Sequence, residues 1–409
     1  MTFFALPPAE ARLPLQALYR GLLPLAPDFS DKLGKHVGAE VCGLANNART
    51  LFYLLFKALR SRASFDRGEI LLPGYTCYSV AAAAVKAGCK VALYDLDPSS
   101  FQPDFADVKE KITARTLAVV GQHLLGVEAD INRLVAIAHD HGLCCIEDAA
   151  QHLGSVTGAS TVSQRNADFS VFSFGRGKPL PLGGGGALIA RGEREFAGLP
   201  HDFELLPADK FTNRLLPFAV QILSRPRLYW LLETLPLGLG QTVYNPDFGV
   251  STMPSFYQRI GASALPGLEK LNQHRAGIGR LYQSLFSQQA DVLPAVGMPA
   301  YVRYPLLVSN QQEVRRMTSY GVRQLYPLAL CDLPALQADL VEGRTQARGA
   351  REIARRLVTL PTHLAVDASS AKKIAGEAHR YFRDIETIQI CSKESGDHFA
   401  EAMQCPAAG

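Results

Sequence analysis

Two stretches of this sequence decide its fold: Ile146-Glu147-Asp148-Ala149-Ala150-Gln151 and Phe172-Ser173-Phe174-Gly175-Arg176-Gly177-Lys178, the second followed closely by Gly183–Gly186. Each stretch comes at the end of a continuous apolar run, which is typical of a strand buried on both faces of a parallel sheet. Functional side chains in such sheets gather at the carboxyl ends of the strands. The sequence therefore predicts that Asp148 and Lys178 lie at the same edge of one sheet.

Short β-rich runs alternate with helical patterns from about Glu69 to Ala190. This alternation predicts an α/β domain whose mainly parallel sheet is covered by helices on both faces. The expected strands are Glu69–Leu72, Lys90–Tyr94, Thr116–Val120, Cys144–Glu147, Phe169–Phe174 and Ala187–Ala190. The expected helices between them are Ser79–Lys86, Phe105–Ile112 and Ile131–Asp140.

The chain is expected to divide into two domains and a tail. Residues 1–265 form an N-terminal segment and the large domain, with an apolar insertion at 211–248. A linking helix that includes Glu269–Gln283 leads into a smaller α+β domain, and together they span 266–391. Residues 392–409 are small and polar, and we expect them to be disordered. The smaller domain is expected to contain a strand at Tyr301–Val308 and helices at Gln311–Tyr320 and Thr345–Leu357.

The insertion at 211–248 is rich in Leu and Pro and carries Trp230 together with Arg225 and Arg227. One interpretation is a helical insertion that packs on the body of the protein or on a second subunit. The other is a surface with a weak membrane association or a contact to a lipid-linked substrate, because amphipathic segments with Arg beside aromatic residues favour a membrane interface.

The composition excludes several classes of protein. The 409 residues include 42 Lys and Arg against 38 Asp and Glu, a net charge of +4 with no block of like charge, so no nucleic-acid partner is expected. The eight cysteines lack C-x-x-C spacing, which favours reduced thiols over disulfides or a metal site. The N-terminus has no basic, apolar leader, and no uncharged run is long enough to span a membrane. We therefore expect a cytoplasmic protein.

Asp148 and Lys178 each have an ordinary structural interpretation. An Asp after a strand often caps the next helix, and a lone Lys is usually a solvated charge. The glycine run lacks the G-K-[ST] ending of a phosphate-binding loop and the G-x-G-x-x-G pattern of a dinucleotide site. Together, however, the pair is what pyridoxal 5'-phosphate (PLP) requires. The lysine forms an imine with the cofactor, and the carboxylate keeps the pyridine nitrogen protonated so that the ring accepts electrons.

These stretches resemble the DegT/StrS-type nucleotide-sugar aminotransferases, which are PLP enzymes of fold type I. The family pattern E-D-x-A-Q followed by S-F-x-x-x-K-x-L-x-x-G-x-G-G is matched from Glu147 to Gly186. The resemblance extends from about Val41 to about Phe382. It includes four further segments: Asp95-Leu96-Asp97-Pro98, Gln122–Gly126, Gly321–Leu330 and Leu360-Pro361-Thr362-His363.

The resemblance implies a role for each matched residue. Lys178 would form the Schiff base with the cofactor and later move the proton between carbons. Asp148 would pair with the pyridine nitrogen, and Gln151 would contact the ring substituents. Ser173 would bind the cofactor phosphate. The family's S-G-T turn falls on Asn46-Asn47-Ala48, and amides at a helix N-terminus bind phosphate whatever the side chains, so Asn47 and Ala48 could serve; a plain Asn N-cap is the alternative.

Several positions depart from the family pattern. Cys77 stands where the family has an aromatic residue that stacks on the cofactor ring, so Tyr75 or Tyr78 would have to cover the ring instead. The family's N-Y-R segment, which reaches the partner subunit, falls near Val250-Ser251-Thr252 and is not recognisable. A glycine, Gly184, replaces the glutamate of the family's G-E-G-G. These departures affect the substrate pocket and the contact between subunits.

Three residues are candidate substrate contacts. Arg176 lies two residues before the lysine and could bind a donor carboxylate or a substrate phosphate as a planar fork, or else face solvent. His123 ends a predicted strand where the family also has a histidine, and a satisfied buried histidine is the alternative. Tyr326 belongs to the matched Tyr326-Pro327 pair.

The resemblance therefore implies a PLP-dependent aminotransferase that transfers an amino group from glutamate to a nucleotide-linked keto-sugar, in polysaccharide or secondary-metabolite sugar biosynthesis. The resemblance also implies a homodimer with its active site between the subunits. Family members with histidine in place of the lysine are sugar dehydratases, and Lys178 disfavours that activity. Two alternatives stay open: an aminotransferase acting on an aminocyclitol or a carrier-linked keto substrate, and a catalytically silent homologue that acts as a binding module.

Overall fold

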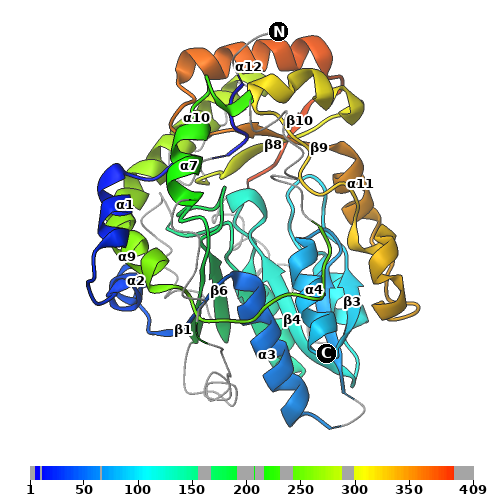
Figure 1. The fold of residues 1–409 in the computed structure, drawn as a ribbon. Helices are drawn as coiled ribbons and strands as arrows, with labels where there is room; N and C mark the ends of the chain where they lie inside the picture. Colours follow the sequence, from blue (N-terminus) through cyan, green and yellow to red (C-terminus); the bar gives the residue numbers. More distant parts are fainter. Residues whose placement is uncertain are drawn as a thin grey trace, which may run out of the picture.

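The computed structural model describes residues 5–9, 12–64, 67–154, 167–190, 207, 216–230, 243–287 and 299–390. Its largest element is a seven-stranded sheet with the strand order β1-β7-β6-β5-β4-β2-β3 (Figure 1). Strands β2 to β6 run parallel to one another, whereas β7 and β1 are antiparallel to their neighbours. The prediction of a mainly parallel sheet is confirmed. The strands are β1 (Val41–Ala45), β2 (Glu69–Pro73), β3 (Lys90–Tyr94), β4 (Thr116–Gln122), β5 (Cys144–Asp148), β6 (Phe169–Ser173) and β7 (Gly186–Ala190).

All six strands expected from the sequence are present, each with its ends within two residues of the expected ones. Strand β1 was not expected. It lies at the edge of the sheet, is only partly buried, and has an irregular register beside Gly43. A short strand with a glycine inside it has neither the clean alternation nor the continuous apolar run that predicts a strand.

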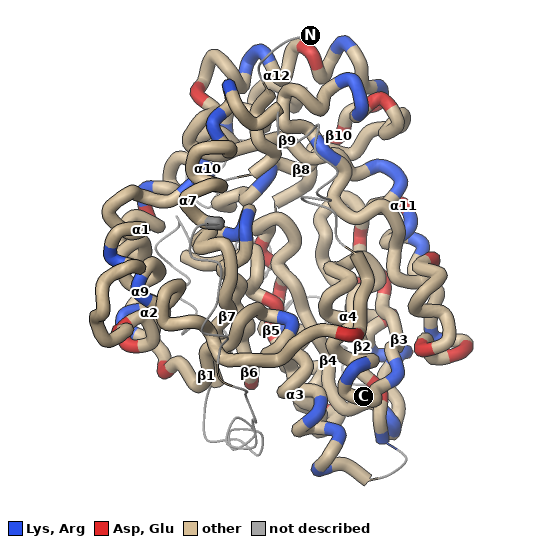
Figure 2. Tube along the Cα trace, in the orientation of Figure 1, with Lys and Arg blue, Asp and Glu red and all other residues tan. Residues whose placement is uncertain are grey.

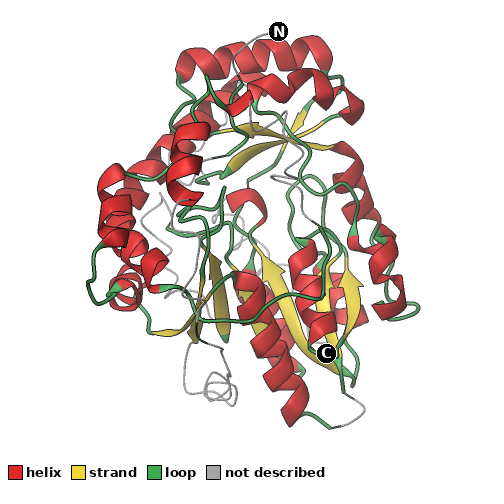
Figure 3. Ribbon diagram, in the orientation of Figure 1, coloured by secondary structure: helices red, strands yellow, loops and turns green. Residues whose placement is uncertain are grey.

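The helices of the large domain pack on this sheet (Figure 3). Helix α3 (Ala48–Arg62) packs on α4 (Tyr78–Lys86) and on β6 and β7, while α6 (Ile131–Asp140) packs on β4 and β5. Helix α5 (Phe105–Lys111) packs on β3. Side chains that precede three of these helices accept hydrogen bonds from first-turn amides, as N-caps do: Asn47 for α3, Asp104 for α5 and Asp130 for α6.

The small domain is built on a three-stranded antiparallel sheet with the order β10-β8-β9. The long helix α10 (Leu268–Phe286) packs on α12 (Ala368–Tyr381). The strands are β8 (Arg303–Leu307), β9 (Leu357–Pro361) and β10 (Glu386–Thr387). The expected strand at Tyr301–Val308 and the expected linking helix are therefore present, as β8 and α10.

Other expectations for the small domain need correction. The segment Gln311–Tyr320 is a 3-10 helix rather than an α-helix. The helix expected at Thr345–Leu357 is α11 (Arg348–Arg356), and strand β9 begins at the very next residue. No glycine or proline separates helix from strand there, so the sequence has no punctuation to mark the boundary. Strands β9 and β10 and helix α12 were not expected.

The N-terminal segment packs on α9 (Ser255–Ala264) and on the described part of the insertion. It contains α1 (Leu15–Leu22) and α2 (Phe29–Val37), which pack on α9. The described part of the insertion contains α7 (Leu216–Leu223), where Gln221 exchanges two hydrogen bonds with the backbone of Leu13. The Ala5 amide donates to the Pro226 carbonyl at 2.9 Å. This part of the insertion thus packs on the same chain; residues 208–215 and 231–242, like the expected tail at 392–409, lie outside the described residues.

The small domain lies over the carboxyl ends of the parallel strands (Figure 1). The Asp95 carboxylate accepts hydrogen bonds from the first amides of α11, at Gly349 and Ala350, both at 2.9 Å. The Val341 amide donates to Val91 of β3, so the small domain also covers the edge strand of the large sheet. These contacts hold the small domain against the end of the sheet at which the functional residues lie.

Charged residues of both signs are interleaved over both domains (Figure 2). Among the described helices, none combines the length and the apolar character that crossing a membrane requires. The six cysteines within the described ranges are free thiols.

Candidate active site

The structure brings Asp148 and Lys178 together at the carboxyl edge of the large sheet. Asp148 is the last residue of β5, which pairs with β6, and Lys178 follows β6 by a short glycine-bordered turn. Burial raises the pKa of the Asp148 carboxyl, while the nearby charge of Lys178 acts to lower it. The Ala150 amide also donates to Asp148 Oδ1 at 3.0 Å. A buried carboxylate close to an amine is suited to hold a cationic ring nitrogen.

Beneath Asp148, three buried side chains form a hydrogen-bonded network. His123 Nε2 lies 2.7 Å from Glu147 Oε1, and Ser170 donates to the other carboxylate oxygen. The Ala129 amide donates to His123 Nδ1 at 3.0 Å, so the imidazole proton is on Nε2 and points to Glu147. His123 and Glu147 are almost fully buried. His123 is thus a satisfied buried histidine under the site, in agreement with the structural alternative considered for it.

Gln151 is held by the loop that follows β4. Its Oε1 accepts a hydrogen bond from the Leu125 amide at 2.7 Å. Leu125 has φ 58°, a left-handed conformation that a non-glycine residue adopts at some energetic cost. The amide oxygen of Gln151 is directed to Leu125. The amide nitrogen, Nε2, therefore points away from Leu125 and can donate a hydrogen bond to a ligand.

The N-terminus of α3, the end of β6 and the glycine run form one cradle. The Gly185 amide donates to the Asn46 carbonyl, and the Phe174 amide donates to Gly185. A Cβ atom on Gly186 would lie 2.7 Å from the Ala48 nitrogen, so only glycine lets β7 pass this turn. Asn47 Oδ1 accepts from the Thr50 amide, while the first amides of a helix have no partner within the helix and are suited to bind phosphate.

Ser173 and Lys178 face the same glycine in this cradle. A Cβ built on Gly175 would lie 3.7 Å from Ser173 Oγ and 3.9 Å from Lys178 Cγ. The hydroxyl, the helix amides and the lysine are therefore neighbours, which is the donor set that a phosphorylated aldehyde such as PLP needs. These residues fit the cofactor.

The loop after β2 and the first residue of α4 place two aromatic rings against the small domain. The Tyr75 hydroxyl donates to the Tyr326 carbonyl and accepts from its amide, at 3.2 and 3.1 Å. The Tyr78 hydroxyl does the same with Leu328, at 2.9 Å for both bonds. Both rings lie against Tyr326, with centroids 5.4 and 5.8 Å away. The hydroxyls of Tyr75 and Tyr78 thus connect the large domain to the small domain, and we call these two residues the clasp.

Tyr326 also lies close to Asp148. Burial raises the pKa of Tyr326 well above its usual value, and Cys77 and Asp148 act in the same direction. Cys77 is half-buried and precedes α4 as its N-cap residue. The structure therefore brings Cys77 and Tyr326 to the site together with Asp148, whereas Arg176 is exposed and lies near Tyr257.

Two buried residues of α10 support the site and were not singled out by the sequence. Arg275 Nη1 donates to the Pro179 carbonyl at 2.9 Å, and Nη2 donates to the Lys178 carbonyl at 3.3 Å. Asn272 accepts from Arg275 and donates to the carbonyls of Leu153 and Gly154. One helix thereby fixes both the lysine turn and the segment after Asp148. No sequence signal distinguishes these residues from surface residues of an ordinary helix.

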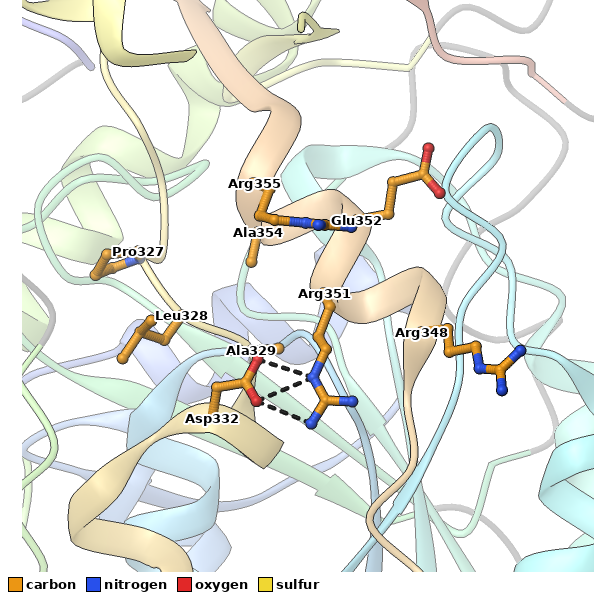
Figure 4. Close-up of a pocket in the computed structure, with 9 residues that line it drawn as sticks. All are labelled: Pro327, Leu328, Ala329, Asp332, Arg348, Arg351, Glu352, Ala354 and Arg355. Atoms are coloured by element: carbon orange, nitrogen blue, oxygen red, sulfur yellow. Dashed lines mark hydrogen bonds and ion pairs between the residues drawn. The ribbon is translucent and has the colours of Figure 1, made fainter. Parts of the chain in front are cut away.

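The small domain has a separate cavity of about 360 Å³ between α11 and the segment after Tyr326 (Figure 4). Asp332 and Arg351 form an ion pair in it, at 2.9 Å. Neither Lys178 nor Asp148 lines this cavity. It is an open, charged hollow beside the clasp rather than the site described above.

Comparisons with known proteins identify related aminotransferases. The model of the DegT/DnrJ/EryC1/StrS aminotransferase family matches residues 21–197. The chain is 31% identical over 363 residues to UDP-2-acetamido-2-deoxy-3-oxo-D-glucuronate aminotransferase of Pseudomonas aeruginosa, covering 86% of this chain and 89% of that protein. It is 34% identical over 166 residues to a putative L-glutamine:3-amino-2,3-dideoxy-scyllo-inosose aminotransferase of Streptomyces kanamyceticus, covering 40% of this chain. That match spans 38% of the Streptomyces protein, and two further relatives are matched over 37% and 45% of their length.

Solved structures share the fold. PseC of Helicobacter pylori, an aminotransferase involved in the biosynthesis of pseudoaminic acid, superimposes with a TM-score of 0.71 at 18% identity, covering 92% of this chain and 99% of that one. The sugar aminotransferase Spr1654 of Streptococcus pneumoniae, described as putative, superimposes in its PLP form with a TM-score of 0.69 at 15% identity, covering 91% and 97%. Its PMP form gives 0.68. These likenesses establish a fold-type-I architecture.

Proposed function

The chain belongs to the DegT/DnrJ/EryC1/StrS aminotransferase family, and from that premise we propose that it is a PLP-dependent aminotransferase acting on a keto-sugar. The observation that supports this best is the placement of Asp148 and Lys178 at the ends of neighbouring strands, beside a cradle suited to phosphate. A silent homologue would have no need of all three features at one edge. The same placement makes a binding module the weaker alternative.

Each residue of the site has one task in this proposal. Ser173 and the first amides of α3, at Ala48, would hold the cofactor phosphate. Asp148 would keep the pyridine nitrogen protonated, and Gln151 would contact the ring substituents. When bound, PLP supplies an electron sink for the carbon that loses its proton.

Lys178 moves the proton in both halves of the proposed reaction. Its Nζ takes the proton from the α-carbon of the amino donor in the first half, and it gives a proton to the sugar carbon that receives nitrogen in the second. The main-chain carbonyls of Lys178 and Pro179 are held by Arg275, so the lysine side chain starts from a fixed point. Fixed placement is what makes such proton transfers fast.

For the substrate, we propose a nucleotide-linked keto-sugar with glutamate as the amino donor. The Pseudomonas relative, named for a UDP-linked 3-oxo-glucuronate, supports this because it is matched over most of both chains. The Streptomyces relative, named for an inosose, keeps an aminocyclitol as the second candidate. A homodimer with the site between subunits also stays a proposal that follows from the family.

The first test is the absorption spectrum of the purified protein with added PLP, before and after borohydride. Wild type is expected to show a visible band that borohydride removes while it fixes the cofactor covalently to the protein. Lys178→Ala is expected to show neither the band nor the covalent attachment, and Lys270→Ala serves as the control because Lys270 is exposed on α10. Loss of the band on adding glutamate or glutamine would identify the donor. A Lys178→Ala protein with a wild-type band and wild-type turnover would refute the proposal.

A second experiment distinguishes the two candidate substrates. The amine-loaded protein is mixed with a UDP-linked 3-keto-sugar or with scyllo-inosose, and return of the visible band is followed. Return with the nucleotide sugar alone supports the proposal, and return with the inosose alone supports the aminocyclitol alternative. A band that never changes with any donor would favour the binding module.

A further inference from the structure

Arg303, the first residue of β8, has an unusual environment. Its Nε and Nη2 atoms are both buried, and neither has a hydrogen-bond partner. No acidic side chain in the described ranges forms an ion pair with it. Buried N–H groups that lack a hydrogen-bond partner are costly, and native proteins rarely leave them so. The arrangement therefore indicates two donors that no residue of the described ranges satisfies and that are available to a ligand.

The titratable groups that act on the charge of Arg303 are one arginine and three tyrosines. They are Arg323, Tyr229, Tyr75 and Tyr326. Burial, with Arg323 as the next contribution, lowers the pKa of Arg303 to about 9. A guanidinium that is destabilised by burial and by a second cation gains most from binding an anion, because the anion offsets both effects.

Arg303 lies next to the loop that contacts Gln151 of the candidate site. The adjacent Val302 amide donates to the Leu125 carbonyl at 3.2 Å, and Leu125 in turn donates to Gln151. Tyr326 acts on the charge of Arg303 and is itself affected by Asp148. Along β8, Tyr304 points the other way, to Gln283 of α10, so the alternation of the strand directs Arg303 away from α10. The guanidinium thus belongs to the boundary between the domains, beside the proposed reaction centre.

We propose that Arg303 binds a carboxylate group of a reactant, through the Nε and Nη2 edge of its guanidinium. These two N–H groups are parallel, and they match the two oxygens of a carboxylate in a side-on, bidentate pair. Both donors are enclosed in the structure, so the entering carboxylate must displace a side chain that covers them. The inference rests on the proposed function, because it takes the carboxylate to arrive with the amino donor or with the sugar.

The first experiment is a calorimetric titration of glutarate, an unreactive dicarboxylate, into the PLP-loaded protein. Arg303→Gln is expected to weaken binding by about tenfold to a hundredfold, as loss of a charge-assisted bidentate pair does. Arg303→Lys is expected to remain weak, because a point charge does not replace a planar fork. Arg316→Gln, which changes an exposed arginine of the same domain, is expected to bind glutarate like wild type.

Two single-turnover arms then identify the source of the carboxylate. If it is the donor's, Arg303→Gln raises the half-saturating glutamate concentration and leaves the reaction with a keto-sugar unchanged. If it is a uronic acid's, the variant loses its preference for a keto-uronate over the neutral keto-sugar and reacts normally with glutamate. Either result supports a carboxylate site at Arg303.

One result would overturn the inference: an Arg303→Gln protein, with a wild-type melting temperature, that binds glutarate as tightly as wild type and performs both half-reactions normally. Failure of the proposed function is distinguishable from this. A wild-type protein that transaminates nothing would refute the proposed function, while the glutarate titration would still decide the role of Arg303.

Discussion

Replacing Gly186 with alanine tests whether the turn before α3 is the phosphate cradle. An alanine Cβ would lie 2.7 Å from the Ala48 nitrogen, 2.9 Å from its Cα and 2.9 Å from the Asn47 carbonyl carbon. All three are backbone atoms, so no side chain can turn away to make room. Since ordinary contacts of this kind begin near 3.4 Å, the turn must move by about half an ångström or more.

The size of the effect follows from that displacement. Forcing an extra carbon into a well-packed region costs ~1–3 kcal/mol. If the displaced amides hold the cofactor phosphate, most of this energy is taken from PLP binding, and the dissociation constant rises by about tenfold or more at 1.4 kcal/mol per decade. We therefore expect Gly186→Ala to bind PLP at least about tenfold more weakly than wild type.

The assay is a titration of cofactor-free protein with PLP, followed by its visible absorption, with urea unfolding of the same samples. Gly376→Ala is the matched control, because Gly376 lies within α12 with no atom near the added carbon. That variant should gain ~0.5–1 kcal/mol of stability and bind PLP like wild type. A Gly186→Ala protein with an unchanged PLP dissociation constant would show that the phosphate lies elsewhere.

Three further predictions concern the site and the domain boundary. Burial raises the pKa of the Asp148 carboxyl in the cofactor-free protein, so the folded state holds the proton more tightly than the unfolded state. The folded protein therefore loses stability as the pH rises from 3.8 through the raised pKa. Cofactor-free Asp148→Asn should be more stable than wild type in urea unfolding at pH 7, and this gain should vanish toward pH 3.8. Asp95→Ala removes the cap of α11 and should lower the free energy of unfolding by ~1–2 kcal/mol; an unchanged urea midpoint would contradict the capping. Tyr78→Phe removes both hydrogen bonds to Leu328 and should cost ~1–3 kcal/mol, measured in the same way; a variant as stable as wild type would argue against the clasp.

The parallel strands and the two central residues could be predicted because their signals are local. Strands β2 to β6 are five to seven residues long, and most of their positions are buried, so each reads as a continuous apolar run. Asp148 and Lys178 then follow from the rule that functional residues gather at strand ends. The glycine run indicated that two backbone segments approach closely there, but it did not indicate which turn is the partner.

Partners far apart in the sequence could not be predicted. Tyr75 and Tyr326 are 251 positions apart, and the sequence gives no reason to pair them rather than to place Tyr75 on the cofactor ring. Likewise, Arg275 on α10 carries no sign that its guanidinium is buried against the carbonyls of Lys178 and Pro179. Helical periodicity tells which face of a helix is apolar, but not what lies opposite it.

By itself, then, the sequence determined the α/β class, the order of the parallel strands along the chain, and the residues that end β5 and follow β6. Those features depend on residue type and spacing over about ten positions. Only the tertiary structure decided that Tyr75 and Tyr78 bind the small domain, that Arg275 fixes the lysine turn, and that the Nε and Nη2 atoms of Arg303 are buried without a hydrogen-bond partner. The physical reason is that burial and charge pairing depend on which surfaces meet when the two domains pack, and that packing brings together side chains whose separation along the chain has no local signature.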